Sequence, residues 1–158
     1  MKYFALVLLF ALSACVVNLK NEKTTSNIIH VDVQCSYPGK NELNTIEHSY
    51  RKEIAEGRYA KSDELAFDPG QQLLILNRAL VLHFFEMPAT LKHTTETDTQ
   101  THSLHIVADT LDNTVTWRGS LDGLRPDKYR FKELVEYIDS MARTTDAYLI
   151  LPKAKDEQ

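Results

Sequence analysis

The sequence has only two cysteines, Cys15 and Cys35, in 158 residues. Such a number excludes the class of small domains held together by several disulfides. Basic residues form no block along the sequence. The 18 Lys and Arg are outnumbered by 22 Asp and Glu, and the net charge is −4. We therefore expect no nucleic-acid partner and no electrostatic attraction of the folded chain to anionic lipid.

Glycine is scarce, at five residues, and glycine-rich phosphate and dinucleotide motifs are missing. The Gly119-Ser120 pair does not belong to the G-x-S-x-G pattern of a nucleophile elbow. Residues 109–113 offer oxygen ligands but lack the central glycine and terminal glutamate of a calcium loop. The sequence thus predicts no catalytic constellation, no metal and no cofactor, which favours a non-enzymatic protein.

No apolar run near the N-terminus is long enough to cross a bilayer as a helix. The run Tyr3–Leu12 falls well short, since about 20 residues are needed. It follows Lys2 and precedes the small residues Ser13 and Ala14. This order is typical of a secretory signal, so residues 1–14 are expected to be a signal peptide.

The sequence Leu12-Ser13-Ala14-Cys15 resembles the lipobox of bacterial lipoprotein precursors. The resemblance implies that the Cys15 thiol receives a diacylglycerol, that cleavage occurs just before Cys15, and that the new amine is acylated. Two or more acyl chains make such an attachment to the membrane effectively permanent. The alternative is an ordinary secretory signal with a chance cysteine near its cleavage site.

Val16 stands where inner-membrane lipoproteins tend to carry aspartate, and so resembles the class sorted to the outer membrane. In a Gram-negative cell the domain would then face the periplasm. Residues 15–27 are mostly polar and are expected to be the acylated cysteine and a flexible tether, reaching at most about 40 Å. Residues 28–152 are expected to form one globular domain, and 153–158 a charged tail.

Hydrophobic spacing predicts the elements of this domain. Alternation over Ile28–Tyr37 predicts a half-buried strand, and helical spacing predicts helices over 41–56 and 126–143. Three shorter segments are predicted as strands, the first two forming a hairpin joined near Asp112-Asn113: 104–108, 114–118 and 147–151.

Residues 68–87 fit two interpretations. Asp68-Pro69-Gly70-Gln71 has the capping residues of a helix start. The apolar runs that follow are short, however, and Pro-Gly is a strong turn signal, so strands are slightly favoured. Together the elements predict an α+β fold, with a small, mostly antiparallel sheet and about two helices on one face.

Two groups of side chains are candidates for chemistry. Cys35 lies on the apolar side of its predicted strand, opposite His30, so a buried thiol is favoured over a nucleophile. The stretch from His93 to Asp109 resembles a metal-ligand set in composition, but its spacing favours a solvated segment. It holds three histidines and three acids: His93, His102, His105, Glu96, Asp98 and Asp109.

The tyrosines and the single tryptophan are favoured as residues that cover a core, with a binding surface as the alternative. They include Tyr50, Tyr59, Tyr129, Tyr137 and Trp117.

The first hypothesis is an envelope lipoprotein, held to a membrane through Cys15, whose domain binds an envelope protein or the cell wall. The second is an envelope enzyme or metal-binding protein that uses the stretch from His93 to Asp109. The third is a carrier of a small ligand, with an apolar pocket lined from residues 73–87.

Overall fold

A computed structural model describes residues 30–36, 41–92, 101–119 and 125–154. They form a seven-stranded sheet in the order β4-β3-β2-β1-β6-β7-β5. Every neighbouring pair is antiparallel except β5 and β7, which are parallel. The strands are β1 (Val31–Ser36), β2 (Asn41–Asn44), β3 (Ser49–Ala55), β4 (Arg58–Ser62), β5 (Thr90–Lys92), β6 (Thr101–Ala108) and β7 (Leu111–Arg118).

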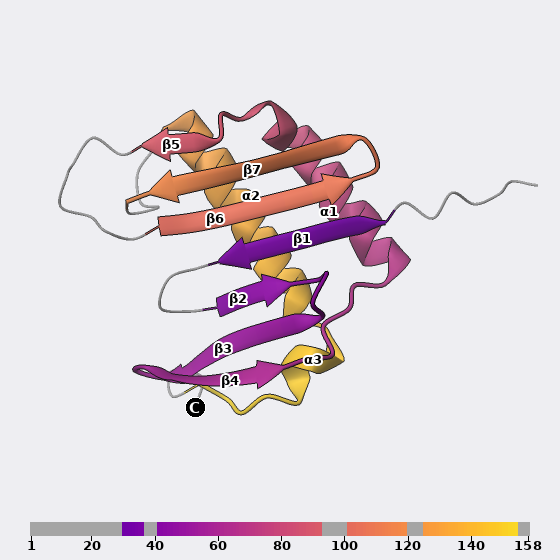
Figure 1. Cartoon of the computed structure of the whole chain (residues 1–158), viewed down its shortest axis with the longest axis vertical. Helices are drawn as coiled ribbons and strands as arrows, with labels where there is room; N and C mark the ends of the chain where they lie inside the picture. The colour runs from indigo at the N-terminus through magenta and orange to yellow at the C-terminus, as the bar shows by residue number, and fades with distance from the viewer. Residues whose placement is uncertain (1–29, 37–40, 93–100, 120–124, 155–158) are drawn as a thin grey trace, which may run out of the picture.

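The helices α1 (Pro69–Val81) and α2 (Pro126–Ala142) lie side by side behind this sheet (Figure 1). A 3-10 turn η1 (Phe84–Glu86) follows α1, and a short helix α3 (Asp146–Leu149) follows α2. The α+β prediction, with helices on one face, is confirmed. None of the described helices is long and apolar enough to span a membrane.

The core lies between the sheet and the two helices. Alternation puts Val31, Val33 and Cys35 of β1 on this side, as predicted from the sequence. The largest fully buried side chains come from strands and helices alike and include Trp117, Tyr50, Phe84, Phe131, Ile75 and Ile138. The helix predicted over 126–143 is confirmed as α2, which buries Phe131, Leu134, Val135, Ile138 and Ala142.

The helix predicted over residues 41–56 is wrong. This segment is a hairpin of β2 and β3, with Leu43 directly opposite Tyr50. Their separation of seven residues equals two helical turns, and it also fits a hairpin pair on one face. Arg51 forms an ion pair with Glu42 across the strands. β4, which follows Gly57 (φ +67°), was not predicted.

The preference for strands in residues 68–87 is also wrong, because residues 69–81 form α1. The Asp68 side chain accepts a hydrogen bond from the Gln71 amide at 2.9 Å, and the Gln71 side chain accepts one from the Asp68 amide at 3.0 Å. This reciprocal capping box, with Pro69 at the first helical position, satisfies free backbone donors of the first turn. Pro-Gly therefore starts a helix here.

Two smaller corrections concern the later segments. The 147–151 strand is wrong, because residues 146–149 form α3, in which Ala147 is buried while Leu149 is exposed. The hairpin of β6 and β7 is confirmed, but its turn lies at Asp109-Thr110, where Asp109 has φ +53°. Asp112 and Asn113 are paired strand residues. A short apolar run does not distinguish a strand from a helix, so the sequence could not decide the type of element at 146–149.

Candidate functional site

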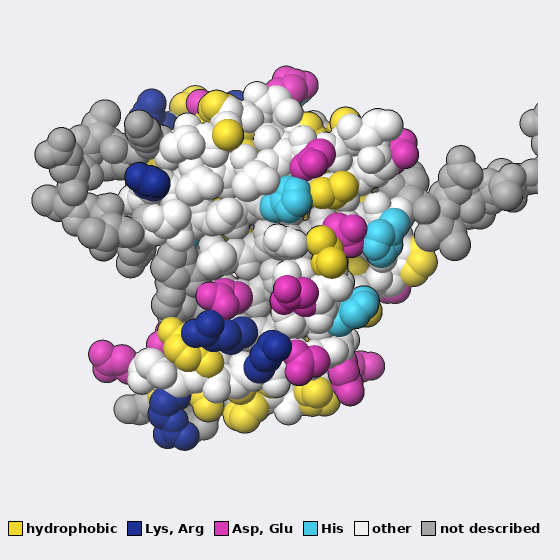
Figure 2. All heavy atoms as spheres, viewed as in Figure 1, with side chains coloured by type: hydrophobic (Ala, Val, Ile, Leu, Met, Phe, Trp, Pro, Cys, Tyr) yellow, Lys and Arg dark blue, Asp and Glu magenta, His cyan; other side chains and the backbone are white. Residues whose placement is uncertain are grey.

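The sheet face opposite the helices is polar. Strand alternation directs Asp32, Gln34 and Ser36 of β1 to this side, while their neighbours enter the core. Figure 2 views this face, and its charged side chains gather over β2, β3 and β4. Further polar residues of this face include Glu42, Asn44, Ser49, Arg51, Lys61, Ser103, His105, Thr114 and Thr116.

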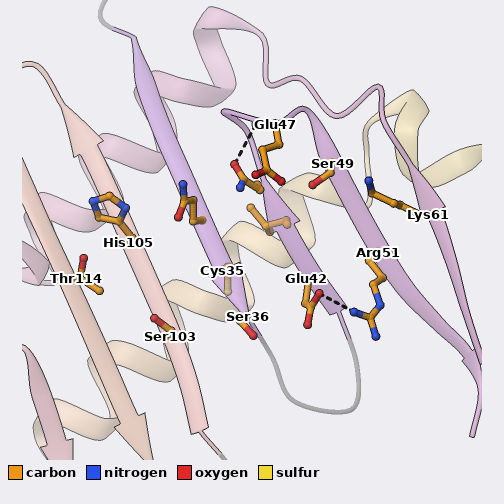
Figure 3. Close-up of a pocket in the computed structure, with 13 residues that line it drawn as sticks. Cys35, Ser36, Glu42, Glu47, Ser49, Arg51, Lys61, Ser103, His105 and Thr114 are labelled. Carbon is orange, nitrogen blue, oxygen red and sulfur yellow. Dashed lines mark hydrogen bonds and ion pairs between the residues drawn. The ribbon is translucent and has the colours of Figure 1, made fainter. Parts of the chain in front are cut away.

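A groove of about 560 Å³ is hollowed into this face. β1 forms its middle, and Gln34 lies between Asn44 of β2 and His105 of β6 in the strand register. Ser36 lies in the same way between Glu42 and Ser103. Figure 3 shows Glu42, Ser103 and His105 in front of their strands, with the helices behind the sheet. The groove is thus lined by hydroxyl, amide and paired charged groups.

The charges on the β3 side of the groove have partners. Arg51 donates to Glu42 at 3.0 Å (Figure 3). Its guanidinium lies 3.9 Å from the ring centre of Tyr59. Lys61 lies 2.6 Å from Asp63, and this hydrogen bond and charge raise the pKa of the Lys61 ammonium. All these groups are well exposed to solvent, so the ion pairs contribute little to the stability of the fold. They hold the side chains on this side of the groove in place.

On the β6 side, the His105 ring nitrogen Nε2 lies 2.9 Å from Asp112 of β7. A hydroxyl nucleophile would need hydrogen-bond contact with this imidazole. Thr114 of β7 lies directly opposite His105 in the strand register, but among the described residues the imidazole is hydrogen-bonded to Asp112 and to no hydroxyl. The His105–Asp112 pair therefore suits a binding wall better than a catalytic triad.

One end of the groove is shaped by the turn between β2 and β3. The Asn44 side-chain carbonyl accepts hydrogen bonds from the backbone amides of Ile46 at 3.0 Å and Glu47 at 3.1 Å. This local arrangement is characteristic of asparagine in turns. It places the Glu47 carboxylate beside the groove (Figure 3).

A second polar cluster lies on the helix side of the sheet. Asp139 of α2 accepts hydrogen bonds from Tyr50 at 3.1 Å, Asn41 at 3.0 Å and Arg143 at 2.8 Å. Burial, followed by the charge of Asp139 and this hydrogen bond, raises the pKa of Tyr50 far above its usual range. Tyr50 therefore remains a neutral donor, and the cluster holds the β2–β3 hairpin against α2.

Cys35 is buried in the core, as its position on the strand predicted. Burial, with a smaller contribution from the Asp139 charge, raises the pKa of its thiol to about 12. A nucleophilic cysteine needs the opposite, a lowered pKa and access to substrate. Cys35 is thus a small hydrophobic residue of the core.

The histidines and acids of the second hypothesis do not converge where they are described. His102 is buried on the helix side of β6, His105 lies on the open face, and Asp109 lies in the turn. No cluster of three metal-ligating side chains occurs within the described ranges. His93, Glu96 and Asp98 lie outside the described residues.

The aromatic residues divide between core and surface. Trp117 and Tyr50 are buried, as expected, while Tyr59 and Tyr129 are exposed. Tyr137 is packed against the edge of the core. Residues 73–87, which the third hypothesis assigned to an apolar pocket, lie in α1 and around η1, and their buried side chains belong to the core. Among the described cavities, the groove on the open sheet face has the largest volume and does not include them.

Sequence reasoning missed the groove residues of β2, β3 and β4. Glu42 and Arg51 had been placed on a helix, although residues 49–52 alternate between the open face and the core. That alternation was the available signal. Cys15, the predicted lipid attachment residue, lies outside the described residues.

No protein-family model matches the chain, and neither a curated protein nor a solved structure matches it.

Proposed function

We propose that this protein is a lipid-anchored lipoprotein of a bacterial cell envelope, whose domain is a non-enzymatic binding or assembly module. Support for the anchor comes from the lipobox Leu12-Ser13-Ala14-Cys15 at the end of a short apolar run. An anchored domain meets partners of the same envelope at a raised effective concentration. The partner can then be an envelope protein or the cell wall.

The observation that carries the binding role is the groove on the open sheet face. Both long helices cover the other face, so the sheet is available over β1, β2 and β6 (Figure 1). A hollow lined from six strands offers several convergent hydrogen-bonding groups, and such groups fix the orientation of a bound ligand.

The groove chemistry favours a ligand rich in hydroxyl and amide groups. Gln34, Ser36 and Ser103 supply uncharged donors and acceptors along its middle. Arg51 and Lys61 are already paired with acids, and the His105 ring contacts the Asp112 carboxylate. A strongly charged ligand would have to break these pairs, whereas an uncharged polar segment of a polypeptide or glycan would not.

The test is photocrosslinking in intact cells from a photoreactive residue placed at Thr114, an exposed position in the groove. We expect one defined envelope component to be captured. The same residue at Tyr129, on the outer surface of α2, is the matched control and should not capture it.

A second variant, Ser103→Trp, fills the groove with a bulky side chain from the polar face of β6. It should abolish capture from Thr114 while leaving the far-ultraviolet circular dichroism spectrum unchanged. Identical products from Thr114 and Tyr129, or full capture in the filled variant, would show that the groove is not the binding site.

A further inference from the structure

The outer side of α1 carries exposed aliphatic side chains. Leu73 is 47% exposed, Leu74 51%, Leu80 46% and Val81 68%. Leu74, Leu80 and Val81 follow Leu73 by one, seven and eight residues, so all four lie on one side of the helix as two pairs that are two turns apart. The exposed Asn77 lies between the two pairs, so the outer side of α1 carries two apolar patches separated by one uncharged amide. Exposed apolar patches of this kind mark a contact with another apolar surface.

The neighbouring helix shows that this surface is unusual within the same layer. The outer side of α2 is charged, and its ion pairs include Asp127–Arg130 and Lys132–Glu136. α1 carries Arg78 as its single charged residue, and Arg78 is paired with Glu133 of α2. The exposed side of α1 therefore presents no carboxylate that would repel an anionic surface.

The start of the described chain lies beside this helix. The backbone amide of Val31, the first residue of β1, donates to the Gln72 side chain of α1 at 3.0 Å. Gln72 directly precedes Leu73 and Leu74. Figure 1 shows the beginning of β1 next to the first turn of α1. A chain from Cys15 to His30 spans at most about 50 Å when extended, so an acylated Cys15 holds the start of β1, and the first turn of α1 beside it, within that distance of the bilayer.

We infer that the outer side of α1 rests on the phospholipid bilayer that holds the acylated Cys15. The inference depends on the proposed anchor. Leu73, Leu74, Leu80 and Val81 enter the boundary between headgroups and acyl chains, as the apolar side of an interfacial helix does. Because the acyl chains already provide attachment, this contact only has to orient the domain.

Orientation has a consequence for the proposed binding role. α1 lies behind the sheet (Figure 1), whereas the side chains that line the groove stand on the open face (Figure 3). A domain that rests on α1 turns its groove away from the membrane. The groove then faces the aqueous compartment, where an envelope protein or the cell wall can enter it.

The test uses the full-length, acylated protein reconstituted into phosphatidylcholine vesicles that contain doxyl-labelled phosphatidylcholine. A fluorescent probe is attached to a new cysteine, in the separate variants Leu74→Cys, Tyr129→Cys and Thr114→Cys. Cys35 is buried and does not compete for the probe, and Cys15 carries the lipid. Tyr129, at 60% exposed on α2, is the matched control for Leu74.

We expect the doxyl lipid to quench the probe at Leu74 at least twofold more than the probes at Tyr129 and Thr114. Equal quenching at the three positions in protein that floats with the vesicles overturns the orientation and leaves the anchor standing. Protein that does not float overturns both. A probe at Leu74 that is shielded from water but insensitive to doxyl lipid shows that another polypeptide covers α1, which also overturns the inference.

Discussion

Replacing Trp117 by alanine is expected to lower the free energy of unfolding by about 3–5 kcal/mol, the usual cost of removing a large buried aromatic side chain. Trp117 is fully buried in β7, between Leu91 of β5 and His102 of β6 in the strand register. Its indole nitrogen donates to the Gly119 carbonyl at 2.9 Å, and the Lys128 ammonium of α2 lies 5.3 Å from its ring. The variant therefore loses contacts in the sheet and with a helix.

The measurement is urea unfolding followed by far-ultraviolet circular dichroism, since the only tryptophan is removed. A loss of this size is a large part of the total stability of a single domain, about 5–15 kcal/mol. Tyr129→Ala, an aromatic truncation at an exposed position of α2, is the control and should change the stability by less than about 0.5 kcal/mol. A Trp117→Ala variant as stable as this control would contradict the described core.

Asp139→Ala is expected to lower the free energy of unfolding by about 2–3 kcal/mol. The substitution removes one carboxylate that accepts hydrogen bonds from Tyr50, Asn41 and Arg143. The Tyr50 hydroxyl then has no charged acceptor beside the core, and leaving a buried donor unsatisfied costs about 1–3 kcal/mol. The separate contribution of Arg143 is small, because its pair with Asp139 is partly exposed to solvent.

Two variants separate this cluster from ordinary surface charge. Tyr50→Phe removes one donor and leaves the others paired, so it should cost about 1 kcal/mol. Glu136→Ala breaks an ion pair with Lys132 on the same helix at 3.8 Å and should cost less than about 0.5 kcal/mol. The unfolding free energies of all three variants can be compared in urea. Equal effects of Asp139→Ala and Glu136→Ala would show that Asp139 does not join the hairpin to α2.

Elements with one uninterrupted period could be predicted from the sequence. The buried positions of β1 alternate from Val31 to Cys35, and those of α2 follow helical spacing from Phe131 to Ala142. In each element a single buried face decides the pattern. The same logic placed Cys35 in the core.

Segments whose pattern fits two periods could not be predicted in this way. Leu43 and Tyr50 satisfy both a helix and a hairpin, and only the pairing of β2 with β1 decides between them. In α1, Leu73 and Leu74 are exposed, so the helix lacks the clear polar side that marks most surface helices. Its capping box was the better signal.

The groove could not be predicted because distant segments build it. Gln34, Asn44 and His105 come together only through the registers of β1 with β2 and with β6. Strand register depends on which face is buried along the whole sheet. A single sequence shows that these residues are polar but not that they share one surface.

Metabolic labelling with an alkyne fatty acid tests the proposed lipid attachment at Cys15 most directly. The full-length protein should carry the label and float with membranes, and Cys15→Ser should lose both properties completely. Cys35→Ala, which alters the other cysteine, should keep both. A labelled Cys15→Ser variant, or unmodified protein recovered from the cytosol with residues 1–14 still attached, would contradict the account.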